Sequence, residues 1–213
     1  MKIFIGHDSK YPQATAVCMK SIKDNGFTGH IEILDKTELK TKGIYNREDI
    51  KGESTEFSFT RFYVPLLTDY TGIALFCDND FLWKCNPEET LEYLEDNDLA
   101  VVKHPMYSAK GKKMDGIKNK TYPRKNWSSL MLFNCNNLTF MSKEYLDKAP
   151  ASDLHELRWA YDIGEIPMEY NCLVGYYNCN NAKALHYTNG GPWFDKYKNS
   201  EQSEQWWKVY NSL

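Results

Sequence analysis

Short apolar runs alternate with polar turns along the chain, and they predict the strands of a sheet. The runs lie at residues 2–5, 30–34, 73–77, 99–103, 129–134 and 182–187. Between the first two, apolar residues recur at helical spacing: Ala14, Val17, Cys18 and Ile22. Gly26 follows them as a helix stop. Strand, helix and strand in this order are typical of a parallel βαβ unit. We therefore expect an α/β fold, a Rossmann-like domain whose central sheet is mostly parallel and flanked by helices.

Further segments read as helices. Residues 55–67 carry aromatic side chains at helical spacing, with Pro65 as a kink or an early end, and Arg61 falls on a different face. Asn86 followed by Pro87 is a strong helix start. Helices are also expected at 154–161 and 200–210. The last of these presents three aromatic residues as a docking face, Trp206, Trp207 and Tyr210.

Two polar segments interrupt these elements. Residues 35–54 are expected to form a mobile loop or an irregular connection. Residues 105–125 are rich in lysine and arginine, which usually indicates only a solvated face. A long loop beside a phosphate site could also act as a lid.

Bulk composition favours one domain over residues 1–213, either a whole protein or one part of a longer one. The 26 basic and 29 acidic side chains give a net charge of −3, so nothing draws the chain to nucleic acid or to anionic membranes in general. No window is apolar over the length that spans a bilayer. We therefore expect neither a nucleic-acid partner nor a membrane span, and the oligomeric state stays open.

The cysteines show no metal-type spacing, and several lie in apolar segments, as free buried thiols do. They are Cys18, Cys77, Cys85, Cys135, Cys172 and Cys179. The N-terminus runs directly into an apolar strand without a secretory signal pattern. These features together favour a soluble protein in a reducing cytoplasm.

The candidate chemistry begins with Asp78, Asn79 and Asp80, which directly follow the apolar run at 73–77. Ligands of open α/β sheets bind at the carboxyl ends of strands, and two carboxylates delivered there suit a divalent cation and the phosphates it carries. An ordinary polar turn is the alternative. A second candidate, His186, ends the run at 182–187 and precedes the glycine pair of 190–191.

Four segments, taken in order, resemble the nucleotide-sugar glycosyltransferases of the GT-A fold. They are 60–65, 78–80, 126–134 and 186–193. The resemblance is to the retaining branch that includes glycogenin-like and plant xylosyltransferase-like enzymes, and in particular to the N-terminal domain of a large chlorella-virus protein. It implies a single GT-A domain with an N-terminal nucleotide-binding part and a C-terminal acceptor-binding part. A viral origin would place the protein in the host cytoplasm.

The resemblance also implies the ligands of the site. Asp78, Asp80 and His186 would bind Mn²⁺, or Mg²⁺ in its place, with Asp78 also near the ribose. The donor would be a UDP-sugar, with UDP-glucose, UDP-galactose and UDP-rhamnose all open, and the acceptor a glycan or glycoprotein. A bound cation offsets the charge of the departing diphosphate.

Other residues follow from the same resemblance. The uracil and ribose region matches the first loop, with Gly6, His7, Asp8 and Tyr11. Asn79 accompanies the acidic pair, and the amides of Gly190 and Gly191 would approach the diphosphate. Gly191 stands where glycogenin-like relatives have a lysine. The missing charge would come from the metal or from another cation, namely Arg61, Lys103, Arg124 or Lys125.

The expected catalytic residues lie around the donor sugar. Arg61, Asn126 and Ser128 match positions that hold this sugar and its phosphates. Asp162 is the first choice for the acid near the anomeric carbon, with Glu165 and Glu169 as alternatives. Transfer is expected to retain the anomeric configuration.

Two other classes of protein stay open from the residues alone. Haloacid-dehalogenase-type phosphatases also place Asp-x-Asp after a strand, although near the chain start and followed by Thr or Val rather than Phe81. The 15% aromatic content would also suit a sugar-binding module without catalytic activity.

Overall fold

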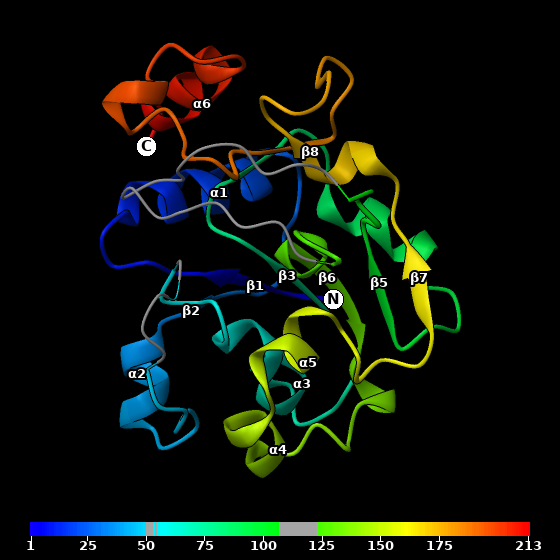
Figure 1. Ribbon diagram of the computed structural model, residues 1–213. Helices are drawn as coiled ribbons and strands as arrows, with labels where there is room; N and C mark the ends of the chain where they lie inside the picture. Colours follow the sequence, from blue (N-terminus) through cyan, green and yellow to red (C-terminus); the bar gives the residue numbers. More distant parts are fainter. Residues whose placement is uncertain (50–52, 54, 107–122) are drawn as a thin grey trace.

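The computed structural model describes residues 1–49, 53, 55–106 and 123–213. Its main sheet has six strands in the order β2-β1-β3-β6-β5-β7 (Figure 1). Their bounds are β1 (Lys2–Gly6), β2 (Ile31–Leu34), β3 (Ile73–Cys77), β5 (Leu99–Val101), β6 (Leu130–Asn134) and β7 (Ile163–Glu165). The α/β fold predicted from the strand–helix–strand pattern is confirmed.

Most strands of the main sheet run the same way. β1 pairs in parallel with β2 and β3, and β5 pairs in parallel with β7. β6 runs antiparallel to both β3 and β5. Because β3 and β5 are both opposed to β6, the carboxyl ends of β1, β3, β5 and β7 share one edge of the sheet.

A second, three-stranded sheet lies beside this edge, in the order β4 (Phe81–Trp83), β9 (Ala184–His186) and β8 (Cys172–Leu173). β4 pairs antiparallel with β9, and Phe81 stands opposite His186. The segment between β3 and β4 is only three residues long, 78–80. Strand pairing therefore brings the acidic segment next to a histidine more than 100 residues away.

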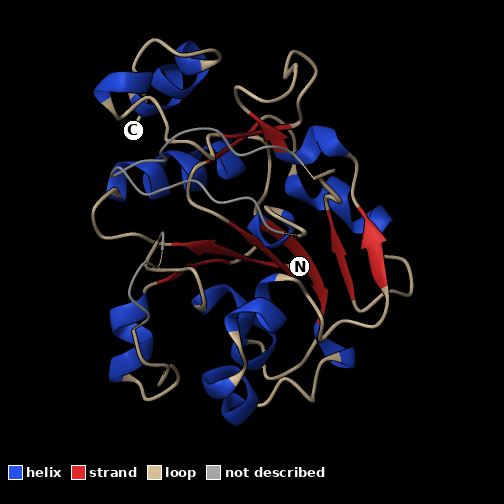
Figure 2. Ribbon diagram, in the orientation of Figure 1, coloured by secondary structure: helices blue, strands red, loops and turns tan. Residues whose placement is uncertain are grey.

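Helices cover both faces of the main sheet (Figure 2). On one face lies α1 (Pro12–Asp24), which contacts α6 (Ser203–Tyr210). The other face is covered by α2 (Lys36–Thr41), α3 (Val64–Leu67), α4 (Lys143–Lys148) and α5 (Ala151–His155) (Figure 1). Side chains alternate across β1, so Ile3 and Ile5 join the core under α1 whereas Phe4 joins the opposite core.

The expected helices form with different geometry or bounds. Residues 55–67 make a 3₁₀ turn, η1 (Thr60–Tyr63), followed by α3, and Pro65 occupies the first turn of α3, where its missing N–H costs nothing. Asn86 caps η2 (Pro87–Tyr93), another 3₁₀ helix, by accepting from the amide of Glu88. The expected terminal helix is α6, and buried Trp206 docks it.

Several elements differ from the sequence expectation. The polar stretch 35–54 contains α2, because Asp35 caps the amides of Thr37 and Glu38. The helix expected at 154–161 is α5, which ends at His155. Four short elements were not expected: α4, β4, β7 and β8. Five lysines of the basic segment, Lys110, Lys112, Lys113, Lys118 and Lys120, lie outside the described residues.

The expectation that several cysteines are free buried thiols is confirmed for three of them, and two others are paired. Cys172 and Cys179 form a disulfide, whereas Cys18, Cys77 and Cys135 are buried thiols and Cys85 is half-buried. Disulfides persist mainly in oxidising compartments, so this bond weighs against the expected reducing cytoplasm.

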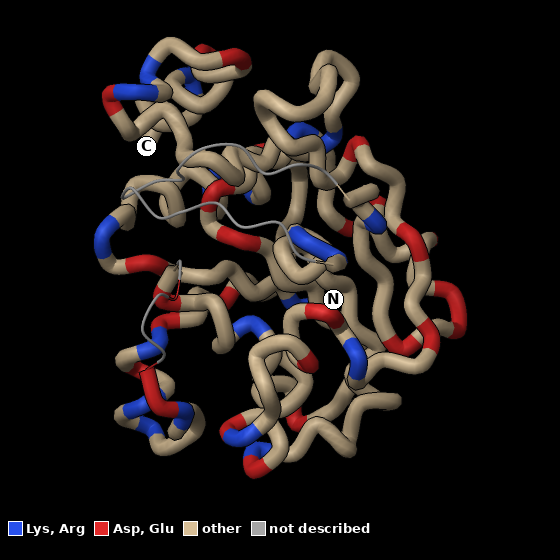
Figure 3. The backbone as a smooth tube through the Cα atoms, in the orientation of Figure 1, with Lys and Arg blue, Asp and Glu red and all other residues tan. Residues whose placement is uncertain are grey.

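Figure 3 shows basic and acidic residues interspersed along the described chain. Among the described residues, no helix has the length and apolar character needed to cross a bilayer.

Candidate active site

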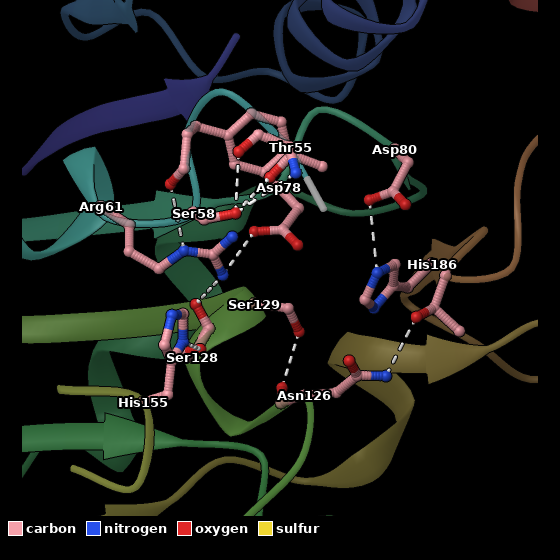
Figure 4. A network of polar contacts seen from close by, with 12 residues as sticks. Thr55, Ser58, Arg61, Asp78, Asp80, Asn126, Ser128, Ser129, His155 and His186 are labelled. Atoms are coloured by element: carbon pink, nitrogen blue, oxygen red, sulfur yellow. Dashed lines mark hydrogen bonds and ion pairs between the residues drawn. The ribbon is translucent and has the colours of Figure 1, made fainter. Parts of the chain in front are cut away.

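Three side chains converge where β3 and β9 end and β4 begins. One potential ligand atom from each of Asp78, Asp80 and His186 lies within 4.8 Å of the others. Asp80 and His186 are almost fully buried, and Asp80 Oδ1 lies 3.3 Å from His186 Nε2 (Figure 4). Two carboxylates and one imidazole with this spacing form a donor set that fits a divalent cation such as Mn²⁺.

The ring of His186 is held on both sides. Phe81 stacks on it with centroids 4.6 Å apart and planes inclined by 24°. Asn171 Oδ1 lies 2.8 Å from its Nδ1. These contacts leave Nε2 facing Asp80, so the ring is oriented by the protein itself.

Arg61 is a buried part of this site. Its Nη1 lies 2.9 Å from Asp78 Oδ1 and donates to the carbonyl of Ser128 at 2.7 Å (Figure 4). The guanidinium also lies over the rings of Phe57 and Phe76. The 3₁₀ turn η1 therefore directs this side chain into the protein.

The first loop is connected to the acidic segment through α1. Thr15 Oγ1 lies 3.0 Å from His7 Nδ1, and Asn79 Nδ2 donates to the same hydroxyl at 3.3 Å. Asp8 is also buried, and burial raises its pKa. The structure therefore brings His7, Asp8 and Asn79 to the edge that carries Asp78.

Gly6 has a packing role. A Cβ at this position would lie 2.5 Å from the ring of Phe57. The absence of a side chain thus lets Phe57 lie directly against the end of β1.

Tyr11 and the glycine pair at 190–191 both contact the aromatic residues that follow these glycines. Tyr11 lies 4.9 Å from the ring of Phe194 and 6.5 Å from that of Trp193. A Cβ at Gly191 would meet the Trp193 ring at 1.9 Å, and Gly190 has a φ of +122°. The glycine pair therefore makes a tight turn whose side-chain space at Gly191 is filled by an indole ring.

Asn126 and Ser128 lie in and beside the short 3₁₀ helix η4 (Trp127–Ser129). Asn126 is buried with a left-handed φ of 64°, and its Nδ2 donates to Thr188 Oγ1 at 3.1 Å. Ser128 Oγ lies 3.4 Å from His155 Nδ1. Both residues lie in the segment before β6, and Ser129, the last residue of that segment, accepts from the amide of Asp78 at 3.0 Å.

Asp162 does not join this cluster. Its carbonyl accepts from the amide of Asp98, whose own carbonyl accepts from Asn134, the partner of Ile73 at the start of β3. Asp78 follows the other end of that five-residue strand, roughly 16 Å away at 3.3 Å per residue. The expectation that Asp162 lies near the anomeric carbon is corrected, because this exposed residue precedes β7 at the opposite sheet edge.

The two alternative acids are also displaced from the metal ligands. Glu165 ends β7 at the correct edge, but β7 is three strands from β3, which corresponds to roughly 14 Å. Glu169 is exposed and lies in a surface pocket with Glu89 and Lys183.

The other basic side chains proposed to supply positive charge differ in their exposure and contacts. Arg124 is exposed and donates to the carbonyl of Glu156 at 2.7 Å, and its guanidinium lies over the ring of Trp127. Lys125 is buried beside Asn126, and Lys103 is half-buried after β5.

Sequence reasoning missed the buried His104, the half-buried His155 and Asn171. His104 stacks on Tyr177, and burial together with nearby His186 lowers its pKa to about 3. Asn171 ends the segment 162–171, which the sequence singles out for its acidic residues. Nothing in that segment indicates that Asn171 contacts His186. Pairing with His186 depends on the parallel contact of β8 with β9, which no local pattern reveals.

Solved structures with a similar fold are sugar-transferring enzymes. Galactosyltransferase LgtC, solved with donor and acceptor sugar analogs, gives a TM-score of 0.60 at 14% identity over 100% of this chain and 96% of its own. GlyE of Streptococcus pneumoniae gives 0.61 at 15% identity over 98% of this chain and 59% of its own. A glycosyltransferase involved in glycosylation of the major capsid of PBCV-1 gives 0.51 at 12% identity over 98% of both chains. These similarities establish a GT-A fold.

Sequence comparison adds one curated relative. No protein-family model matches the chain. Protein CDI of Arabidopsis thaliana is 39% identical over 218 residues, which cover 96% of this chain and 84% of that protein. The chain belongs to the family of Protein CDI.

Proposed function

We propose that this protein is a metal-dependent glycosyltransferase that moves a sugar from a UDP-sugar to a glycan or glycoprotein acceptor. The convergence of Asp78, Asp80 and His186 at the sheet edge of a GT-A fold carries this proposal. UDP-glucose, UDP-galactose and UDP-rhamnose are the candidate donors.

The three converging side chains would hold Mn²⁺, or Mg²⁺ in its place. When bound, the cation offsets the negative charge of the leaving nucleoside diphosphate without a proton transfer. Arg61 fixes the carboxylate of Asp78, and the burial of Asp80 and His186 keeps water away from their donor atoms. A buried, pre-arranged donor set strengthens electrostatic interactions with the diphosphate.

The first loop would bind the nucleoside end of the donor. Asp8 and Tyr11 are proposed contacts for the ribose and the uracil, supported by the link from His7 through Thr15 to Asn79. The amides of Gly190 and Gly191 would meet the diphosphate. Tyr11 already lies in the same aromatic cluster as the segment after these glycines.

The turn before β6 would hold the donor sugar through Asn126 and Ser128. Retention of the anomeric configuration is proposed through same-face attack guided by the leaving group. This route is favoured because Asp162, the acid expected from the sequence, stands at the other edge of the sheet.

The proposal is tested by measuring UDP release from the three donors with and without Mn²⁺. Release should depend on the metal, and Asp80→Asn and His186→Ala should each lower it by about 100-fold or more, because loss of an outer-shell partner alone typically costs 10–100-fold. Asp24→Asn, a surface change in α1, is the matched control. Asp162→Asn should leave release unchanged, because Asp162 lies at the opposite edge of the main sheet.

Other outcomes would assign a different function. Phosphate release from a phosphomonoester, without turnover of any nucleotide sugar, would favour a phosphatase. Sugar binding that is indifferent to Mn²⁺ and to Asp80→Asn would indicate a binding module.

A further inference from the structure

Asn171 connects the metal-ligand candidate His186 to a buried chain of hydrogen bonds. Asn171 ends η6 (Met168–Asn171), is 0% exposed, and places its amide between His186 and Ser129. Its Oδ1 lies 2.8 Å from His186 Nδ1, and its Nδ2 donates to Ser129 Oγ at 2.9 Å. Ser129 Oγ in turn lies 2.7 Å from the carbonyl of Asn126.

The backbone carbonyl of Asn126, at the end of this series of hydrogen bonds, determines which group donates in each bond. A backbone carbonyl can only accept, so the Ser129 hydroxyl donates its single proton to Asn126. Ser129 Oγ must therefore accept from Asn171, which assigns the NH₂ group to that side of the amide and the oxygen to the side of His186. Since an amide oxygen accepts, His186 Nδ1 must carry a proton.

A neutral imidazole carries one proton, so the proton at Nδ1 leaves a lone pair at Nε2. This lone pair faces Asp80 Oδ1 across 3.3 Å, inside the group of potential metal ligands. Two acceptors at this distance are stabilised only by a cation between them or by a proton.

We propose that Asn171 is a positioning residue, which selects the His186 tautomer whose Nε2 can bind a divalent cation. This inference rests on the proposed metal site but not on the identity of the sugar donor. Asn171 does not itself touch the cation. It accepts from the ligand's second nitrogen, as the outer-shell partners of metal-binding histidines commonly do.

The first test reads the tautomer directly in the metal-free wild-type protein. Two-bond ¹H–¹⁵N spectra distinguish a protonated from an unprotonated ring nitrogen in His186. The expected result is a proton at Nδ1, where Asn171 Oδ1 accepts it. A proton at Nε2 in the neutral ring would overturn the proposal.

The second test measures Mn²⁺ affinity by titration with electron paramagnetic resonance, without any nucleotide. Asn171→Leu, similar in size but unable to accept, should weaken Mn²⁺ binding 10–100-fold. Asn171→Asp retains an acceptor and should stay within a few-fold of wild type. Asn25→Leu is the control, because it removes an amide that donates to Trp83 in the same small sheet without touching His186.

The outcomes separate this inference from the proposed function. Equal Mn²⁺ affinity in wild type and folded Asn171→Leu would refute the positioning role, whatever the enzyme activity. If Asn171→Leu does not fold, a loss of affinity in Asn171→Asp as large as in His186→Ala would refute it. Tight Mn²⁺ binding with the expected tautomer but no UDP release would refute the proposed function and leave the role of Asn171 intact.

Discussion

At the scale of single residues, polar groups held away from water determine part of the pH dependence of stability. His155 illustrates this, since its ring lies 5.2 Å from those of Phe59 and Phe62. Burial, and then the charges of Arg61 and Arg47, lower the pKa of His155 to about 3. The folded protein therefore holds this ring neutral next to the arginine that orients Asp78.

The lowered pKa of His155 predicts acid destabilisation. An unfolded histidine has a pKa near 6.5, so between about pH 6.5 and 3 the unfolded state binds a proton that the folded state does not. The free energy of unfolding should therefore fall as the pH falls through this window. His155→Asn should reduce the slope by up to about 1.4 kcal/mol per pH unit. Urea unfolding at several pH values measures this change.

The control for this experiment is His30→Asn, because the side chain of His30 is 63% exposed. Its slope should match wild type. An unchanged slope in His155→Asn would show that folding does not lower the pKa of His155.

The place of a candidate ligand in the fold was predictable from the sequence where one local pattern assigned that residue to a strand end. Asp78 and Asp80 follow an apolar run, and His186 ends another, so each could be assigned to a strand end. Asp162 was misassigned because its place in the order of motifs says nothing about which end of a strand it occupies. Asn171 was missed because its role lies in a contact with a residue 15 positions later.

At the scale of elements, strand existence was more predictable than strand direction. The apolar run at 129–134 predicts β6 but carries no mark of its antiparallel course. Short strands such as β7 and β8 have too few residues for a periodic signal. The tertiary pairing of β9 with β4 and β8, which assembles the site, therefore became visible only in the structure.

The disulfide is an element-scale feature that can be tested by removal. The loop closed by Cys172 and Cys179 follows Asn171, and its Tyr177 stacks on His104. A loop of this length is stabilised by roughly 2–3 kcal/mol in the chain-entropy account. Replacing both cysteines by alanine should lower Tm by roughly 5–10 °C for a domain of this size. Calorimetry of the oxidised protein measures this shift.

Cys85→Ala provides the comparison, since Cys85 is a half-buried free thiol. It should change Tm much less, and reductant should lower the Tm of wild type but not of the double variant. The unreduced wild-type protein should contain four free thiols, Cys18, Cys77, Cys85 and Cys135. Six free thiols would disprove the disulfide.

At the scale of the whole molecule, the fold explains how distant segments form one site. The parallel strands of the main sheet bring the loops after β1 and β3 to one edge. The small sheet adds His186, which ends β9. The α/β class and its mostly parallel sheet were predictable because they follow from strand–helix–strand order. The similarity to solved glycosyltransferases extends over the whole chain, so the site lies within a GT-A fold.

The central claim is that Asp78, Asp80 and His186 together bind one divalent cation. Diffraction data from crystals grown with Mn²⁺ and UDP, collected near the manganese absorption edge, test it most directly. The expected result is one anomalous peak within about 2.0–2.3 Å of a carboxylate oxygen and of His186 Nε2, with the diphosphate on its open side. Ordered UDP with no manganese peak among these three side chains, or a peak held by other residues, would contradict the account.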